Sequence, residues 1–306
     1  MAWFLESVRP DTPKPVLELV GEQGCGKSDT QSRLRDLIDP NDVNLRAAPR
    51  KVEDIFVGAS NNWMFSLNNL SRLTAEQQDA FCTLSTGGGH ASRQLYTNAD
   101  ESVIEVKRPV MLNGISDLAT AQDLVDRTLR IELPVIKHRR RVTDMEAEFE
   151  KNRGRILGGL LDLFVKSLGH LPLVSLDHLP RMADFATLGE AMLNAMNREP
   201  GTFSRLYQEK REQSIIHALD ASPVARAVQE FMENRLTPFT GTVKELLCKL
   251  AEYRYGSDGW PRSAKGLSNS LRRHAPALRV VGVSIAFESR RRRDGYHITV
   301  DHIVYP

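Results

Sequence analysis

The eight residues 21–28, Gly-Glu-Gln-Gly-Cys-Gly-Lys-Ser, constrain this chain most, because they complete the glycine-rich pattern of a phosphate-binding loop. The apolar run Val16–Val20 precedes the loop, and residues 31–38 follow it with apolar residues at helical spacing. Glycines allow backbone N–H groups to surround phosphate oxygens, while Lys27 reaches the β- and γ-phosphates and Ser28 is placed for Mg²⁺. Strand, loop and helix in this order predict an α/β fold that binds ATP and Mg²⁺.

We assign the loop and the residue after it to nucleotide binding. The set comprises Gly21, Glu22, Gln23, Gly24, Cys25, Gly26, Lys27, Ser28 and Asp29. Lys27 is also a candidate catalytic residue, and Ser28 is a candidate metal ligand. The alternative is a chance glycine-rich turn, which the flanking strand and helix patterns disfavour.

The composition of the 306 residues is that of a globular protein, with 41% hydrophobic and 26% charged residues. Cys25, Cys82 and Cys248 lie far apart in the sequence, which argues against a disulfide framework or a zinc site and fits a reducing cytoplasm. Glu6 interrupts a short apolar stretch near the start. We find no signal peptide and no apolar run of membrane-spanning length, so we expect a cytoplasmic protein with no membrane partner.

The pattern divides the chain into three parts, which we expect to be a nucleotide-binding α/β core (residues 1–143), a helical subdomain (144–219) and a winged helix-turn-helix domain (220–306). In the core, strands are predicted at Val16–Val20, at residues 55–59 or 63–67, at 103–106 and at 110–112. Residues 74–84 are predicted to be helical, with Thr74 as N-cap and Gln77 completing a capping box. From residue 144 onward, apolar residues recur at three- and four-residue spacing, as in helices.

The last part has three helical patterns, at residues 224–234, 243–253 (with Thr242 as candidate N-cap) and 263–274. Strand patterns follow at residues 280–288 and 296–300, around a turn at 293–295. Three helices and then a hairpin is the order of a winged helix-turn-helix.

Basic residues gather in this last part. Between residues 262 and 293 there are nine Lys or Arg and one acidic residue, on the third helix and the hairpin tip that would touch DNA. A solvated face, or a winged domain used for protein contacts, is the alternative. The candidate DNA-binding residues here are Lys265, Arg272, Arg273, Arg290, Arg291, Arg292 and Arg293.

A second element of the Mg²⁺ site should lie at the end of an apolar strand, where an acidic residue normally holds the water shell of the metal. The best candidate strand lies in residues 63–71 and ends in Asn68 and Asn69. An amide binds a water molecule but cannot neutralise the metal or act as a base. We assign Asn68 to the metal site and Asn69 to catalysis; Glu53 and Asp54 are poorly placed substitutes.

Other residues complete the candidate machinery. Asn113 ends an apolar strand, where a polar side chain can hold the attacking water. Arg127 is the first candidate for an arginine finger that acts on a neighbouring subunit, and Arg130 is the second. Either arginine can instead form a surface ion pair. Residues 86–106 are predicted to form a hairpin, with Arg93 and Tyr96 available for a phosphate and a base of DNA.

Together these residues resemble the superfamily-3 helicases and the related primase-helicase ATPases of phages and integrative elements, which are AAA+-related P-loop ATPases. The resemblance is best over residues 16–134, and residues 180–186 and the tail are also similar. It implies a hexameric ring, ATP hydrolysis and central-channel hairpins that grip single-stranded DNA. Lys27 and Ser28 match the family's phosphate loop, Asn113 matches its sensor, and Arg127 is our choice for its finger.

The chain departs from that family at two places. The family's acidic metal residue maps to Asn68, which puts efficient hydrolysis in doubt. Only 20 residues precede the loop, which leaves no room for a primase domain or a helical collar. We therefore expect a truncated product, or a motor that works with a separate primase.

The sequence thus predicts an ATP-hydrolysing DNA motor, a helicase-type ATPase of a phage or mobile element that forms a homo-oligomer. It would act on single-stranded DNA, and on duplex DNA through the winged domain. The alternative is an ATP-gated DNA-binding switch or assembly factor with little hydrolysis, which Asn68 favours. A small-molecule kinase is a third interpretation, and it leaves the basic tail unexplained.

Overall fold

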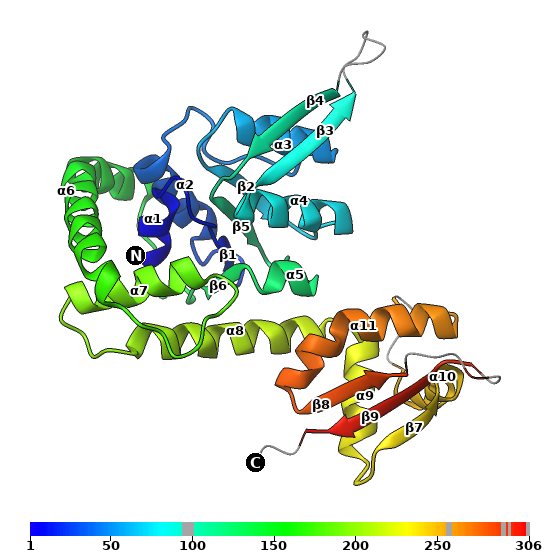
Figure 1. Cartoon of the computed structure of the whole chain (residues 1–306). Coiled ribbons are helices and arrows are strands. Elements are labelled where there is room, and N and C mark those ends of the chain that lie inside the picture. Colours follow the sequence, from blue (N-terminus) through cyan, green and yellow to red (C-terminus); the bar gives the residue numbers. More distant parts are fainter. Residues whose placement is uncertain (94–100, 255–258, 289–291, 293–294, 304–306) are drawn as a thin grey trace. The chain divides into compact units, whose positions relative to one another are not determined.

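The computed structural model describes residues 1–93, 101–254, 259–288, 292 and 295–303. It divides into two compact units, Met1–Arg211 and Glu212–Pro306 (Figure 1). Helix α8 (Thr202–Asp220) contains the point of division. We describe each unit by itself.

The first unit is built on a parallel sheet with the strand order β2-β5-β1-β6. Its strands are β1 (Val16–Val20), β2 (Phe65–Leu70), β5 (Val110–Gly114) and β6 (Thr128–Glu132). Every residue of β1 and β5 is buried, which explains why both strands are apolar except for Glu18 and Asn113. The predicted α/β class is confirmed as a parallel central sheet with helices. Strand β6 was not predicted.

Five helices connect or flank these strands: α1 (Ala2–Ser7), α2 (Lys27–Ile38), α3 (Val52–Ser60), α4 (Ala75–Thr86) and α5 (Gln122–Val125). The capping box predicted for α4 is confirmed, since Thr74 and Gln77 exchange both hydrogen bonds. The expectation of a strand at residues 55–59 is wrong. These residues lie in α3, where Ile55, Phe56 and Ala59 form one buried face. The strand is instead β2, which overlaps the alternative prediction at residues 63–67.

The hairpin predicted after α4 is confirmed in its described strands. β3 (Gly88–Arg93) pairs antiparallel with β4 (Glu101–Val106). The two strands form a separate sheet that extends away from the central one (Figure 1). The predicted strand at residues 103–106 therefore belongs to the hairpin.

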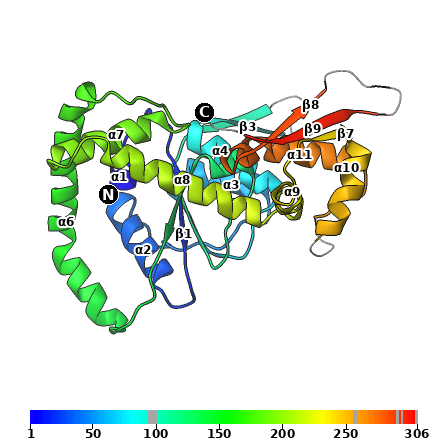
Figure 2. The same ribbon diagram turned by 90° about the horizontal axis from the view of Figure 1, so that it is seen from below.

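The helical pattern predicted from residue 144 is also confirmed. It contains α6 (Val142–His170), the short 3₁₀ turn η1 (Leu171–Leu173), α7 (Ala183–Ala195) and α8. Helix α6 lies at the periphery of the first unit beside α7 (Figure 2). By length and composition alone, Val142–Leu173 is apolar enough to cross a membrane, the one such segment among the described residues. Five of its apolar side chains, Leu157, Leu160, Leu163, Phe164 and Leu171, pack against the core.

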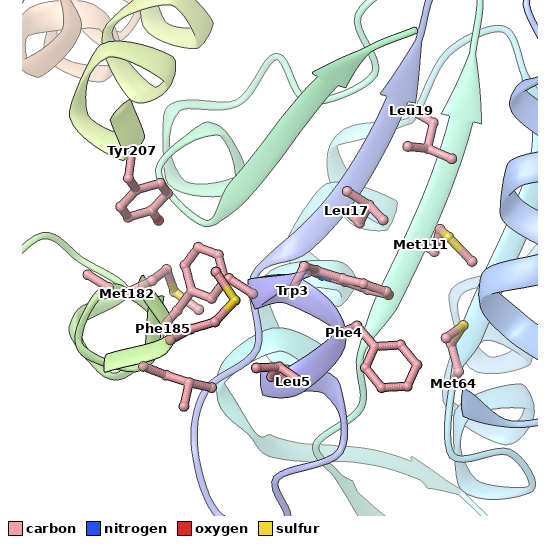
Figure 3. Close-up of a cluster of buried hydrophobic side chains, with 14 residues drawn as sticks. Trp3, Phe4, Leu5, Leu17, Leu19, Met64, Met111, Met182, Phe185 and Tyr207 are labelled. Atoms are coloured by element: carbon pink, nitrogen blue, oxygen red, sulfur yellow. The ribbon is translucent and has the colours of Figure 1, made fainter. Parts of the chain in front are cut away.

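A buried cluster joins the helices of the first unit to its sheet (Figure 3). Trp3 and Leu5 of α1 lie between Leu17 of β1 and Phe185 of α7. The indole N–H of Trp3 donates to the carbonyl of Pro15 at 2.7 Å, which fixes α1 at the start of β1. This packing anchors α1 and α7 to the sheet whose carboxyl edge carries the candidate site.

The second unit contains three helices and a three-stranded antiparallel sheet with the order β7-β9-β8. The elements are α9 (Pro223–Glu233), β7 (Phe239–Thr242), α10 (Val243–Leu250), the 3₁₀ turn η2 (Ala251–Tyr253), α11 (Ala264–Val280), β8 (Val283–Phe287) and β9 (His297–His302). The three helices and the β8–β9 pair are confirmed, as is Thr242 as N-cap. Strand β7 was not predicted.

Candidate nucleotide and nucleic-acid sites

The glycine-rich loop connects the carboxyl end of β1 to the start of α2, so it lies at the carboxyl edge of the parallel sheet. Gly24 and Gly26 have φ angles of 83° and 84°, a left-handed conformation that side chains rarely adopt. Gly26 is the N-cap of α2 and supplies no side-chain acceptor to its first N–H groups. These groups are therefore available to an anion, as at other anion-binding helix N-termini.

Lys27, the first residue of α2, folds back onto the loop. Its Nζ donates to the carbonyl of Gly21 at 2.7 Å and to that of Glu22 at 2.9 Å. Nζ also lies 3.6 Å from Sγ of the buried Cys25. Neutral carbonyl oxygens are weaker acceptors than phosphate anions, so an incoming phosphate can displace them.

A polar network brings together three residues that the sequence analysis assigned to the site. The Ser28 hydroxyl donates to Asn68 Oδ1 at 2.7 Å, and Asn113 Nδ2 donates to the same oxygen at 2.6 Å. Asn113 is 1% exposed, and its Oδ1 accepts the backbone N–H of Asn69 at 2.7 Å. The loop, β2 and β5 are thereby joined by neutral groups.

The strand register breaks at this point. β2 pairs regularly with β5 up to Leu67, shifts over the next two residues, and resumes at Leu70. Asn69 has a φ of 57°, and it joins the network through its backbone N–H. Such an irregularity redirects side chains at the edge of a sheet.

Gln31 is a member of the network that the sequence analysis missed. It is fully buried, and its Nε2 donates to Ser66 Oγ at 2.8 Å and to the Leu67 carbonyl at 2.9 Å. Its Oε1 accepts from Asn113 Nδ2. Its position in the sequence could have indicated this. Gln31 comes four residues after Lys27 and therefore lies one turn farther along the same face of α2.

A buried carboxyl group lies beneath this edge. Glu18 of β1 is 2% exposed, and its Oε1 accepts the backbone N–H of Leu118 at 2.5 Å. Burial raises the pKa of Glu18 to about 7, against the lowering effect of the hydrogen bond. Glu18 thus ties the segment after β5 to the strand that carries the loop.

The remaining loop residues are accessible. Gln23 is exposed, and so is Glu22, which takes part through its backbone carbonyl. Asp29, in the first turn of α2, forms an ion pair with Arg33 at 3.1 Å. Their assignment to nucleotide binding stays a prediction.

Arg127 and Arg130 are not arranged as finger residues. Arg127 is 8% exposed, and its Nη1 lies 2.5 Å from the Asp123 carboxylate. Arg130 is also paired, its Nε lying 2.7 Å from Asp117. A finger has to be exposed and free to reach a phosphate on another subunit, so this geometry argues against both residues. Sequence shows neither burial nor pairing, which is why the pattern suggested them.

In the second unit, α11 presents a basic face. Lys265, Arg272 and Arg273 are all exposed, and their spacing places them along one side of the helix. The guanidinium of Arg272 lies 4.0 Å from the ring centroid of Phe287 on β8. That contact holds one of the charges against the sheet without neutralising it.

Several candidate DNA-binding residues fall partly or wholly outside the described structure. Tyr96, Arg290, Arg291 and Arg293 lie outside the described residues, and Arg93 is described only as the last residue of β3. Arg292 is exposed, and its Nε donates to Glu288 Oε2 at 2.8 Å, so this charge is neutralised within the turn.

Comparison with known proteins now identifies the chain. The family model for the actinomycete integrative conjugative element replication protein matches residues 1–201, and the model for the C-terminal domain of the same RepA family matches residues 224–302. The chain belongs to this replication protein family. The mobile-element origin predicted from the sequence is thereby confirmed for this RepA chain.

Two other comparisons add little to the RepA assignment. No curated protein shows significant similarity to the chain. One solved structure, the A form apo structure of the NrS-1 C-terminal region, matches over 99% of this chain and 70% of its own, with 12% identity and a TM-score of 0.41. A likeness at that level does not establish a shared fold.

Proposed function

We propose that this RepA chain is an ATP-binding DNA motor of the element's replication machinery, a helicase-type ATPase of the superfamily-3 kind. The observation that carries the proposal is the Ser28–Asn68–Asn113 network beside the glycine-rich loop. It joins the Ser28 hydroxyl and the Asn113 amide at the carboxyl edge of a parallel sheet, where α/β proteins bind ligands, which supports their proposed roles as metal ligand and sensor. Lys27 would bind the β- and γ-phosphates of ATP, and Asn113 would orient the attacking water.

The residues at this edge fit Mg²⁺. Ser28 Oγ and Asn68 Oδ1 are hard oxygen donors 2.7 Å apart, and Mg²⁺ takes one or two protein oxygens together with water and phosphate oxygens. Bound there, the ion would neutralise charge on the terminal phosphates. Asn68 contributes no negative charge to the metal, so the phosphate oxygens would neutralise more of the charge of the ion than in a site with a carboxylate.

DNA is the proposed macromolecular partner, because the chain is a replication protein with an exposed basic helix face. We propose that α9 to α11 with β7 to β9 form a winged helix-turn-helix that contacts DNA phosphates through Lys265, Arg272 and Arg273. Arg93 and Tyr96 remain candidates for a strand in a central channel. A homo-oligomeric ring in the cytoplasm, working with a separate primase, remains part of this proposal, now without a finger assigned to Arg127.

Steady-state ATP hydrolysis with and without single-stranded DNA tests the motor. We expect turnover that DNA stimulates and that Lys27→Ala abolishes, because Lys27 is the loop's own cation. Lys210→Ala, on the exposed part of α8, controls for the loss of one positive charge. Tight ATP binding with negligible turnover under both conditions would contradict the motor.

The second candidate function is an ATP-gated DNA-binding switch that hydrolyses slowly. The amide of Asn68 supports it, since it takes the position of the usual carboxylate beside Ser28. Asn68→Asp separates the two functions: a rise in turnover shows that the site lacks only a negative charge. Asn61→Asp, an exposed substitution at the end of α3, is the matched control. Unchanged turnover in Asn68→Asp would show that Asn68 does not hold the metal.

A further inference from the structure

Residues 133–139, which follow β6, pass directly over the glycine-rich loop. A Cβ atom placed on Gly24 would lie 2.8 Å from Arg139 Nη2, and one placed on Gly21 would lie 2.8 Å from the Leu133 carbonyl oxygen. Both distances are shorter than real Cβ contacts. The loop is therefore packed under this segment, and the guanidinium of Arg139 lies against the backbone that would surround the phosphates.

The charge of Arg139 is not neutralised within the described part of the chain. Arg139 is exposed, and no ion pair or hydrogen bond links it to another described residue. Two nearby arginines behave differently: Arg130 pairs with Asp117, and Arg140 pairs with Glu148 at 2.7 Å. Arg139 thus differs from both in holding an unpaired cation at the loop.

Three positive features converge at this point. They are the Arg139 guanidinium, the Lys27 ammonium and the positive end of the α2 dipole. Asp29, in the first turn of α2, is already paired with Arg33. Like charges held together repel one another, and an anion bound between them removes that cost.

We infer that Arg139 is a phosphate ligand of the nucleotide site, supplied by the same chain rather than by a neighbouring subunit. Its planar guanidinium presents paired N–H donors that match phosphate oxygens. It would contact the terminal phosphates of a nucleoside triphosphate bound by the loop. This inference rests on the proposed function, and it names the positive charge that Arg127 and Arg130 do not provide.

A structural consequence follows for α6. Residues 133–139 lead directly to this helix, whose N-cap is Arg141. A phosphate held by Arg139 would fix the connection between β6 and α6. The solvent accessibility of residues 133–139 would therefore depend on whether a nucleotide is bound.

The test is titration of a fluorescent ATP, ADP and AMP series into the full-length chain and into its Arg139→Ala, Arg139→Lys and Arg140→Ala variants. Loss of one charge-assisted contact should weaken ATP binding by about 10- to 100-fold in Arg139→Ala. The loss should shrink from ATP to AMP, and Arg139→Lys should recover part of it. Arg140→Ala, which removes a neighbouring paired charge, should stay within about twofold of the parent chain.

Two controls separate this inference from the proposed function. If the parent chain and Lys27→Ala both fail to bind ATP, the proposed function is wrong. If the parent chain binds, Lys27→Ala does not and Arg139→Ala matches the parent, the role of Arg139 alone is wrong. A mixture of Lys27→Ala and Arg139→Ala chains should bind no more ATP than the two measured apart. Restored binding in that mixture would show that the arginine acts between subunits.

Discussion

At the carboxyl edge of the parallel sheet, Ser28, Asn68 and Asn113 are joined by hydrogen bonds between neutral groups. On α11 of the second unit, Lys265 and Arg272 are exposed positive charges. The first arrangement depends on buried geometry, because each amide needs its partner at hydrogen-bond distance. The second depends on charge density, which works at longer range and is screened over about 10 Å at 0.1 M salt.

This contrast gives each region its own sensitivity. Changes at the sheet edge should alter stability and nucleotide binding while leaving the salt dependence of DNA binding unchanged. Changes on α11 should alter the salt dependence of DNA binding while leaving stability and nucleotide binding unchanged.

The largest effect is expected from Lys27→Ala. Removing the cation that faces the phosphates should weaken ATP binding by about 30-fold or more, since truncating one partner of a close charge pair costs about 2–5 kcal/mol. Isothermal titration calorimetry measures this directly. DNA binding without nucleotide should be unchanged, and a parallel loss of DNA affinity would show that the two regions are not independent.

The second experiment removes the basic face of α11. The triple variant Lys265→Ala, Arg272→Ala, Arg273→Ala should bind duplex DNA roughly 100-fold more weakly at low salt. The slope of log affinity against log salt should fall by about three, one unit for each lost phosphate contact. Fluorescence anisotropy over a salt series measures both quantities.

The matched control for that variant is Arg226→Ala, on α9 of the same unit, where the arginine is paired with Glu230 at 3.2 Å. It should leave the salt slope nearly unchanged. ATP binding should be the same in both variants. A triple variant that keeps the parent's salt slope would mean that the α11 face does not contact phosphates.

A smaller effect is expected from Asn113→Ala, this time on stability. The substitution removes the partner of Gln31 Oε1 and of the Asn69 N–H, and it takes one of the two hydrogen bonds that Asn68 Oδ1 accepts. Unsatisfied buried polar groups cost about 1–3 kcal/mol each, and partial relaxation should bring the total loss to about 2–3 kcal/mol. Urea unfolding measures it. Asn61→Ala, at an exposed helix end, should change stability by less than about 0.5 kcal/mol.

The sequence predicts the parts of both regions that depend on local patterns. The capping boxes at Thr74 and Thr242 need only residues three apart, and both form. Val16–Val20 is apolar apart from Glu18 and is bounded by a glycine-rich loop, which is why its strand was predicted. Residues 55–59 are a short apolar run without such boundaries, and burial of one face decides in favour of a helix.

Other features depend on contacts that no local pattern records. Arg127 and Arg130, the two finger candidates, both pair with acids within the fold. Gln31 joins the network because α2 packs on the sheet, and Arg139 meets Gly24 because the chain crosses the loop after β6. Strands β6 and β7 are short and partly exposed, so their apolar pattern is weak.

Glu18 is a buried carboxyl group beside the neutral network. Because burial raises the pKa of Glu18 to about 7, its protonated form is favoured by folding. The stabilisation is therefore complete below the unfolded pKa, and it is lost as the pH rises from about 4.5 to 7. In Glu18→Gln the amide oxygen can still accept the Leu118 N–H without a charge to bury.

The free energy of unfolding should consequently be similar for the parent chain and Glu18→Gln at pH 5. At pH 8 the variant should be more stable by about 1–2 kcal/mol. Urea unfolding across this pH range measures the difference, and Glu209→Gln on the exposed face of α8 controls for the loss of one surface charge. A difference that does not grow with pH would show that Glu18 is not protonated in the fold. If the difference in unfolding free energy grows with pH while the salt dependence of DNA binding stays fixed, the two regions respond separately. The buried groups of the first unit then respond to protons, and the exposed charges of α11 respond to salt.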